Sequence, residues 1–226
     1  MTITTDRDRR LREDCGLPEL TVGTPRARER LAAVRAAAVV EFRRHGFLGG
    51  SVDDIARRSG VSKPTIYAYA ETKERLFLDA VGDALIAAYA GLPDVGPWSD
   101  PDSARTALRS FLLAWAQRLL EPATIDLRRT VIGEAERFPQ LAELWARTNA
   151  VYGDRPLADA LAAMARAGLL ELPDGDLPLR QLIAMGIGAP QLVATFRPKD
   201  FERSELPVVT AGAVSVFWGH YGKDAR

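Results

Sequence analysis

Cysteine and histidine are scarce in this chain of 226 residues, which contains one cysteine and two histidines. The single cysteine, Cys15, excludes an internal disulfide and agrees with a reducing compartment. His45 and His220 stand far apart in the sequence, and neither belongs to a metal-binding or Ser-His-Asp pattern. We therefore expect no metal, no cofactor and no catalytic residue.

Long apolar runs and phosphate-binding glycine loops are missing as well. No stretch approaches the roughly 20 apolar residues that cross a bilayer, and the N-terminal letters MTITTDRDRRLRED contain no apolar signal segment. The glycines at 46, 49 and 50 are not followed by the lysine of a P-loop. These absences predict a cytoplasmic protein without membrane contact, and they count against the alternative of an enzyme.

Net charge is also absent, because 30 basic residues balance 30 acidic ones, but the two signs are unevenly distributed. Residues 1–25 carry 4 basic and 5 acidic groups, residues 26–75 carry 11 and 6, and residues 76–226 carry 15 and 19. The middle segment therefore has a net charge of +5, while the remainder after it has −4. This distribution is typical of a phosphate-binding module attached to a body that does not bind nucleic acid.

The first 24 residues are polar, mixed in charge and without periodicity, which predicts a flexible arm over residues 1–24. Its arginines either reach along DNA or belong to a solvated tail; they are Arg7, Arg9, Arg10 and Arg12. From Pro25 onward, apolar residues recur at helical spacing, at Leu31, Val34, Ala38 and Phe42. His45-Gly46 then supplies a stop, so we predict a first amphipathic helix that ends there.

Two short helices should follow this first helix. Ser51 is suited to cap a helix over Val52, Ile55 and Ala56 that stops at Gly60. Ser62 is suited to cap the next helix, with Pro64 in its first turn. Two short helices joined by a tight turn containing glycine, and held against a longer helix, form a helix-turn-helix.

The second helix of such a pair can enter the major groove of DNA. Its outward side chains are Lys63, Thr65, Tyr67, Ala68 and Tyr69. A lysine ammonium and tyrosine hydroxyls can donate to phosphates, a threonine can meet a base edge, and an alanine permits close approach. The alternative, that the two tyrosines are core aromatics, meets the objection that residues two apart on a helix do not share one face.

The stretch from Arg30 to Phe77 resembles the DNA-binding domain of the TetR family of regulators. The matching features occur in register: Phe42 and Gly46, then SVDDIA from Ser51, GVSK from Gly60, TIY from Thr65 and KERLF from Lys73. The resemblance implies phosphate contacts from Ser51, Tyr67 and Lys73, with Lys63, Pro64, Thr65 and Tyr69 at the groove. Pro64 and Ala70 depart from the family pattern. The complete predicted DNA-binding set is Ser51, Ser62, Lys63, Pro64, Thr65, Tyr67, Ala68, Tyr69 and Lys73.

The rest of the chain reads as helix after helix, without the alternation of strands, so the predicted fold class is all-α. A fourth helix from Phe77 to Ala88 should link the DNA module to the body and act as its lever. Further helices are predicted from Pro101 to Leu119, over Val131–Phe138, over 141–164 with a bend near Pro156, and over 178–196 and 204–221. The string from Arg128 to Trp145 is similar to ligand-domain helices of one TetR subgroup.

These helices suggest a division into three parts: the arm at 1–24, the helix-turn-helix domain at 25–72, and a ligand-binding and dimerisation domain at 73–226. The last two helices are apolar on more than one face, which favours a second subunit over burial inside a single large core. The candidate dimer contacts are Leu182, Met185, Val214 and Phe217. The resemblance likewise implies a four-helix dimer interface at this place.

A ligand pocket is harder to place, because apolar side chains line pockets and fill cores alike. The candidate aromatics are Phe111, Trp115, Trp145, Tyr152 and Phe196, and each has core packing as its alternative. Asn149 and Gln191 are polar residues within apolar helices, which suits a specific hydrogen bond, although either can face solvent. No ligand class follows from this set.

Together these patterns predict a homodimeric transcription regulator that binds double-stranded DNA and responds to an unknown small-molecule effector. Two recognition helices related by a two-fold axis would read half-sites roughly 34–36 Å apart in a near-palindromic operator. We expect a repressor that its ligand releases from DNA, by differential affinity for two states. An activator of the same family and a non-regulatory DNA-binding protein are the alternatives.

Overall fold

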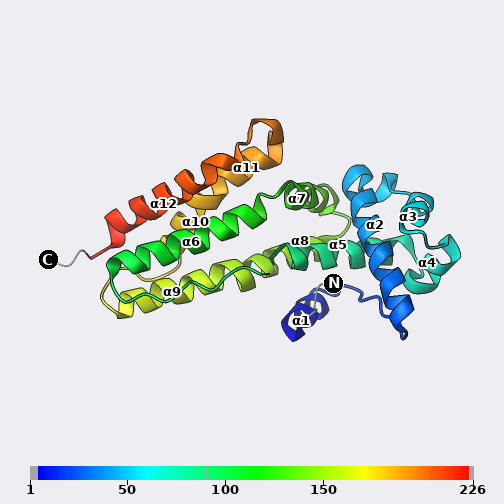
Figure 1. Ribbon diagram of the computed structural model, residues 1–226, viewed down its shortest axis with the longest axis horizontal. Coiled ribbons are helices and arrows are strands. Elements are labelled where there is room, and N and C mark those ends of the chain that lie inside the picture. The colour runs from blue at the N-terminus through cyan, green and yellow to red at the C-terminus, as the bar shows by residue number, and fades with distance from the viewer. Residues whose placement is uncertain (1–4, 90, 224–226) are drawn as a thin grey trace. The chain divides into compact units, whose positions relative to one another are not determined.

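The computed structural model describes residues 5–89 and 91–223, and most of them are helical (Figure 1). Within that part of the chain the one β feature is an isolated bridge between Leu170 and Gly222. The expected all-α fold is therefore confirmed. The chain forms two compact units, one containing residues up to Ala88 with Asp126–Thr148, and the other containing Tyr89–Ile125 with the residues from Asn149 onward. The three functional parts expected at 1–24, 25–72 and 73–226 do not coincide with these units.

The first compact unit begins with five helices along the chain. They are α1 (Asp6–Asp14), α2 (Pro25–Gly49), α3 (Val52–Ser59), α4 (Lys63–Ala70) and α5 (Lys73–Tyr89). The helices α3 and α4 pack on each other and on α2 (Figure 1). The predicted stop appears as Gly46, whose φ of 65° breaks the helical conformation inside α2, a conformation that glycine adopts without steric cost. Buried side chains hold the three helices together, including Phe42, Ile55 and Ile66.

Both predicted serine caps are present. The Ser51 hydroxyl accepts from the Asp54 N–H at 3.3 Å, and the Ser62 hydroxyl accepts from the Thr65 N–H at 3.4 Å. Gly60 closes α3 in the left-handed conformation, with a φ of 68°. The caps satisfy amide donors that have no partner inside a helix, so they define where α3 and α4 begin.

The N-terminal segment differs from the predicted arm. Thr5 and Asp8 form a reciprocal capping box, and α1 follows from Asp6. The apolar residues of this segment are buried, namely Leu11, Cys15, Leu17 and Leu20. The expectation of an arm without a packed element is thus wrong for residues 5–24. A helix of nine residues is too short to show a clear apolar period, and its main anchor, Arg12, is a charged residue.

Two further helices belong to this unit for most of their length: α7 (Pro122–Glu134) and α8 (Pro139–Asn149). The predicted helix over Val131–Phe138 is therefore wrong in its end, because α7 stops at Glu134 and Phe138 lies between the two helices. The cause is Pro139, since the residue before a proline is pushed away from helical conformation. Phe138 is nevertheless buried, as its place in the apolar pattern indicates.

The second unit contains the remaining elements. They are α6 (Pro101–Leu119), η1 (Ala150–Asp154), α9 (Arg155–Arg166), α10 (Leu177–Ile183), η2 (Ala184–Gly188), α11 (Ala189–Phe196), η3 (Pro198–Asp200), η4 (Arg203–Glu205) and α12 (Leu206–Tyr221). The predicted capping of α6 by Asp100 is present, with a reciprocal bond to Ser103. The predicted apolar stripe of α6 is buried, and α12 packs along α6 (Figure 1).

The bend predicted near Pro156 is a π-helical turn, η1, which ends two residues before the proline. A second π turn, η2, ends two residues before Pro190. Proline lacks an N–H and its ring collides with the carbonyl four residues earlier, so a wider turn accommodates it. Each π turn also has a glycine pressed against α6: a Cβ on Gly153 would lie 1.9 Å from the Trp115 ring, and one on Gly186 would lie 2.5 Å from Leu112.

Candidate nucleic-acid interface

The helix α4 presents the predicted recognition surface. Ser62, Lys63, Pro64 and Ala68 are exposed, and Thr65, Tyr67 and Tyr69 are half-buried. Ile66 and Ala70 point inward and are almost fully buried, at 1% exposure each. Neither tyrosine is a core residue, so both phenol groups have access to the surface. This helix therefore offers polar and small side chains to a partner along its whole length.

The N-terminal turn of α4 carries a cluster of hydrogen-bond donors. The hydroxyls of Ser62 and Thr65 are 2.8 Å apart, and the Lys63 ammonium lies 2.9 Å from a carboxylate oxygen of Asp53. The hydrogen bond to Asp53 raises the pKa of Lys63, which keeps its charge firmly in place. Because this ion pair is exposed, it contributes little to folding and can be exchanged for a DNA phosphate.

Two flanking residues, Ser51 and Lys73, stand at the ends of neighbouring helices. Ser51 caps α3, and its own N–H donates to the buried carboxylate of Glu41 at 3.1 Å. The Lys73 ammonium donates to the Leu48 carbonyl at 3.2 Å and lies 4.9 Å from the centre of the Phe47 ring. Their contacts to phosphates stay a prediction.

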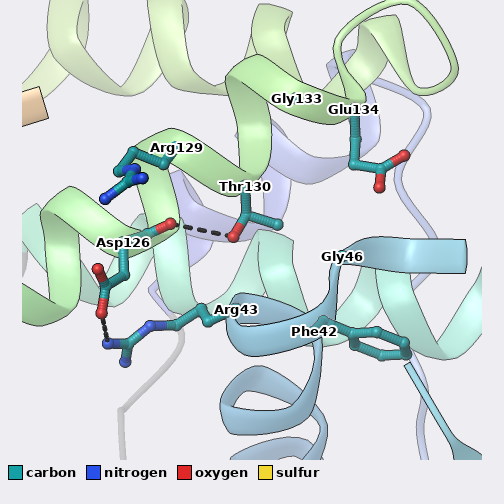
Figure 2. A pocket seen from close by; sticks show the side chains of 8 residues that line it. All are labelled: Phe42, Arg43, Gly46, Asp126, Arg129, Thr130, Gly133 and Glu134. Carbon is teal, nitrogen blue, oxygen red and sulfur yellow. Dashed lines mark hydrogen bonds and ion pairs between the residues drawn. The ribbon is translucent and has the colours of Figure 1, made fainter. Parts of the chain in front are cut away.

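A seam between α2 and α7 was not foreseen from the sequence (Figure 2). It surrounds a cavity of about 370 Å³, lined by Phe42, Arg43, Gly46, Asp126, Arg129, Thr130, Gly133 and Glu134. Arg43 forms an ion pair with Asp126 at 2.6 Å. Glu134 accepts a hydrogen bond from the Phe47 N–H at 2.8 Å. No local pattern indicates such contacts, since the partners are more than 80 residues apart in the sequence.

Four phenylalanines form a cluster beside this seam. Phe77 lies 5.0 Å from Phe42, 5.3 Å from Phe47 and 4.9 Å from Phe138, measured between ring centres, and Phe47 lies 4.9 Å from Phe138. Edge-to-face packing of this kind adds to the stabilisation from burial alone. Helical spacing identified three of these residues as apolar, but only the fold shows that they meet.

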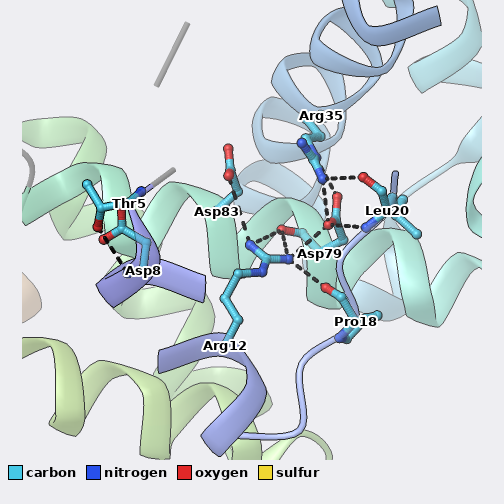
Figure 3. A network of polar contacts seen from close by, with 8 residues as sticks. All are labelled: Thr5, Asp8, Arg12, Pro18, Leu20, Arg35, Asp79 and Asp83. Atoms are coloured by element: carbon cyan, nitrogen blue, oxygen red, sulfur yellow. Dashed lines mark hydrogen bonds and ion pairs between the residues drawn. The ribbon is translucent and has the colours of Figure 1, made fainter. Parts of the chain in front are cut away.

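A second polar network surrounds Asp79 in α5 (Figure 3). Its carboxylate is fully buried and accepts from Arg12 at 2.8 Å, from Arg35 at 2.6 and 2.9 Å, and from the Leu20 N–H at 3.0 Å. Arg12 also donates to the Pro18 carbonyl at 2.6 Å. Arg12 is therefore a structural residue, and the idea that it reaches along DNA is wrong. Arg7, Arg9 and Arg10 remain exposed.

The predicted ligand-pocket residues fall into different environments. Phe111 and Trp115 are buried in α6, with ring centres 6.0 Å apart. The Asn149 side chain accepts a hydrogen bond from the Tyr89 hydroxyl at 2.5 Å, and Tyr152 lies 6.3 Å from the Tyr89 ring. Two others, Trp145 and Gln191, are half-buried, and Trp145 belongs to the first compact unit.

One buried donor in this region stands out. Trp115 is 1% exposed, and no described residue accepts a hydrogen bond from its indole Nε1. An unsatisfied buried donor costs free energy, so such a group usually has a partner that is not part of the chain. The indole Nε1 of Trp218 in α12 is in the same condition.

Three of the four predicted dimer contacts are buried within the chain itself. Leu182, Val214 and Phe217 are at most 1% exposed and pack inside their own chain, and Met185 is half-buried. The apolar side chains that remain exposed on the same helices are Leu192, Phe196, Val208 and Val216, at 60 to 75%. Because α12 is apolar on both sides, its sequence does not show which side faces the chain's own core. Phe196 is also excluded as a core aromatic.

The described residues offer neither a membrane-spanning helix nor a metal-binding cluster. Between residues 5 and 223, residue 90 excepted, no helix is long and apolar enough to cross a membrane. The same residues contain no group of three or more histidine, cysteine or acidic side chains placed to hold a metal ion. Burial raises the pKa of the Cys15 thiol, which disfavours the reactive thiolate.

Comparison with known proteins adds two family matches. Residues 34–80 match the model of the bacterial regulatory proteins of the tetR family. Residues 106–223 match the model of the C-terminal domain of AefR-like transcriptional repressors. A curated protein of Streptomyces coelicolor, the HTH-type transcriptional repressor SCO4008, is 32% identical over 90 residues. That match spans 40% of this chain and 40% of the length of the curated relative.

Solved structures show the same fold. A TetR-family transcriptional regulator from Mesorhizobium loti has a TM-score of 0.68 at 24% identity, with 88% of this chain and 100% of that chain covered. A TetR regulator from Agrobacterium tumefaciens has a TM-score of 0.70 at 18% identity, with 86% and 95% covered. The Flavonoid-responsive Regulator FrrA has a TM-score of 0.64 at 26% identity, with 87% and 98% covered.

Proposed function

Because the chain belongs to the TetR family of bacterial transcription regulators, we propose that it is a sequence-specific repressor that a small molecule releases from its operator. The observation that carries this proposal is the surface of α4. Its first turn presents Ser62, Lys63 and Thr65, its length presents Tyr67 and Tyr69, and Ser51 and Lys73 flank it. A helix with this surface suits the major groove, because donors meet phosphates while small residues permit close approach.

The residues of this surface divide into two roles. Lys73, Ser51 and Tyr67 position the module by donating to phosphates, which carry no sequence information. Thr65 lies in the first turn of α4, where side chains face base edges, and it reads sequence. The +5 charge of residues 26–75 adds a sequence-independent attraction to the DNA.

A mobility-shift assay tests sequence-specific binding. The protein is mixed with DNA from upstream of its own coding region and with random DNA of the same length, at about 150 mM salt, where non-specific attraction is weak. We expect at least about a thousandfold preference for the upstream DNA. Equal affinity for both would contradict a regulator and favour a non-regulatory DNA-binding protein.

Substitutions separate the two roles. Lys73→Ala should weaken binding to every sequence and reduce the salt dependence by about one unit of the logarithmic slope. Thr65→Ala should instead change the preference at one operator position, by about 1–3 kcal/mol. The measurement is the dissociation constant on a set of operators with single base-pair changes. A uniform loss in both variants would contradict the division of roles.

Homodimerisation is the second part of the proposal. The exposed residues Leu192 and Phe196 of α11, with Val208 and Val216 of α12, form an apolar surface that needs cover. A second copy of the chain, related by a two-fold axis, would cover it and place two α4 helices on two half-sites. The operator should then be a near-palindrome, which footprinting of the upstream DNA would show.

Ligand release is the third part. The C-terminal family match is described as a repressor domain, and the Streptomyces relative carries the name of a repressor. We place the ligand beside Trp115, whose buried indole N–H suits a carbonyl, hydroxyl or carboxylate acceptor. Flavonoids are sensible first compounds, since one solved relative is described as flavonoid-responsive.

Thermal unfolding in the presence of such compounds tests this placement. A ligand that binds the folded chain raises the unfolding temperature in a concentration-dependent way, and it should also release bound upstream DNA. Trp115→Phe keeps an aromatic six-membered ring but removes the pyrrole ring with its N–H donor, so it should reduce the shift for a compound that accepts from the indole. Expression of the controlled gene should rise on deletion of the regulator, whereas a fall would indicate an activator.

A further inference from the structure

The turn between Gly46 and Ser51 lies next to two of the proposed phosphate anchors. Ser51 ends the turn and caps α3, and the Lys73 ammonium donates to the Leu48 carbonyl inside it at 3.2 Å. The Phe47 ring of the same turn lies 4.9 Å from that ammonium. A movement of this turn would therefore displace both anchors at once.

The turn is held by side chains from the end of α7 and from the segment between α7 and α8. A Glu134 carboxylate oxygen accepts from the Phe47 N–H at 2.8 Å, and the Glu134 side chain is only 15% exposed. The other carboxylate oxygen of Glu134 lies 3.6 Å from Arg137, whose guanidinium is 5.7 Å from the Phe47 ring. The ring centres of Phe47 and Phe138 are 4.9 Å apart.

Glycine at position 46 permits this close contact. Gly46 has a φ of 65°, and a Cβ there would lie 3.0 Å from the Glu134 carboxylate. Figure 2 shows Gly46 and Glu134 on facing segments of the chain, and the positive φ of Gly46 turns the chain so that the next amide, of Phe47, donates to Glu134. The carboxylate thus replaces the helical acceptor that the Phe47 N–H has lost.

We propose that Glu134 is a positioning residue for DNA binding, which holds the Gly46–Ser51 turn and through it Ser51 and Lys73. The inference rests on the proposed DNA-binding function and deepens it by naming the residue that holds two of the phosphate anchors. Both Glu134 and the Gly46–Ser51 turn belong to the compact unit that contains α2.

The strength of the contact suits this role. A hydrogen bond from an amide to a carboxylate contributes about 1.5–3 kcal/mol, which corresponds to roughly ten- to a hundredfold in an equilibrium constant. That is enough to shift a two-state turn, and it is comparable to typical coupling between distant sites. One half-buried carboxylate is thus sufficient to alter the affinity for DNA.

Three substitutions test the proposal. Glu134→Ala removes the acceptor, Glu134→Gln keeps a carbonyl that can accept from the Phe47 N–H, and Glu136→Ala is the matched control on an exposed acid two residues away. We expect Glu134→Ala to weaken binding to the upstream DNA about tenfold or more. Glu134→Gln and Glu136→Ala should stay within about threefold of the unmodified protein.

Hydrogen exchange provides a readout that general destabilisation would not reproduce. In Glu134→Ala the amides of residues 46–51 should exchange faster, while those of α12 keep their protection. Adding Lys73→Ala to Glu134→Ala should cost less than the sum of the two single losses, because Glu134 acts partly through Lys73. In the unmodified protein, upstream DNA should slow exchange at residues 46–51, which needs no variant at all.

The proposal is overturned if Glu134→Ala binds the upstream DNA as tightly as the unmodified protein, or if exchange at residues 46–51 is the same in both. Full additivity with Lys73→Ala would also contradict it. Failure of the proposed function has a different signature, since the unmodified protein would then bind upstream and random DNA equally. The exchange difference between Glu134→Ala and Glu136→Ala would still report on the contact with the turn.

Discussion

Charged residues are usually exposed and apolar residues are usually buried. The N-terminal segment departs from the first rule, and the α11–α12 pair departs from the second. Residues 5–24 are rich in charge, yet they place Arg12 against a buried aspartate, Asp79. The last helices are rich in apolar residues, yet four large apolar side chains lie at least 60% exposed on them. The charged side chain of Arg12 in the N-terminal segment is paired within the chain, and we call the network around Asp79 the closed region. The apolar side chains of α11 and α12 remain exposed, and we call them the open region.

The difference shows that burial follows from available partners rather than from composition. Asp79 has two arginines and an amide directed at its oxygens, so its buried charge is balanced and hydrogen-bonded. The α12 helix has one core to face, so only one of its two apolar sides can be buried in a single chain. A second copy of the chain would bury the exposed apolar side chains of α11 and α12.

The largest effect on stability should come from removing the buried carboxylate of Asp79. Asp79→Ala leaves Arg12 and Arg35 without their shared counter-ion, and removing one partner of a buried pair costs about 3–5 kcal/mol. We expect a loss of that size in the free energy of unfolding, measured by urea denaturation. Asp14→Ala is the control, because its ion pair with Arg147 is long, at 3.6 Å, and exposed, and it should change stability by less than about 0.5 kcal/mol. Equal losses in both variants would contradict the special status of the buried network.

Placing a charge on the open region should affect assembly instead of folding. If a second copy covers this surface, as proposed, Val216→Glu places a carboxylate from each copy in the interface, where like charges and desolvation oppose association. We expect a loss of about 2 kcal/mol or more in dimerisation, which is about thirtyfold in the dissociation constant, as measured by sedimentation. Ile132→Glu is the matched control, since Ile132 is 52% exposed on α7. If both variants weaken the dimer alike, the assigned surface is wrong.

Local patterns were sufficient for much of the DNA-binding module. The serines 51 and 62 cap their helices as predicted, Gly46 breaks α2, and Ile66 points inward while Tyr67 stays accessible. Each of these features depends on a few neighbouring residues. For the same reason the π turn before Pro156 was expected as a bend, and the one before Pro190 follows from the same rule.

Contacts between distant segments were not predictable in this way. Asp79 meets Arg12 across 67 residues, and Glu134 meets Phe47 across 87 residues. The residues next to each acid in the sequence do not distinguish it from an acid exposed to solvent. The partner that hydrogen-bonds to it is brought there by the tertiary fold. The same limit applies to Val214 and Phe217, which the sequence predicts as dimer contacts and which are buried inside the single chain: periodicity identifies an apolar side but does not say which core it faces.

The smallest expected effect concerns Asp83, which stands at the edge of the closed region. Burial raises the pKa of Asp83, and the charges of Arg35 and Arg12 offset part of this rise. The Arg12 guanidinium lies 3.9 Å from the Asp83 carboxylate. An acid whose pKa is raised on folding binds a proton more tightly in the folded state. Its contribution to stability is therefore fully present below the unfolded pKa, near 3.9, and is lost as the pH rises through the folded pKa.

Asp83→Asn removes this titration and keeps the shape of the side chain. The free energy of unfolding of the variant minus that of the unmodified protein should therefore increase as the pH rises from below 4 toward neutrality, as measured by urea denaturation at several pH values. The change should be modest, since the carboxylate is 36% exposed and solvent screens its charge. A difference that decreases with pH would mean that the attraction of Arg12 and Arg35 outweighs the cost of burial, and Asp83 would then belong to the closed network with Asp79.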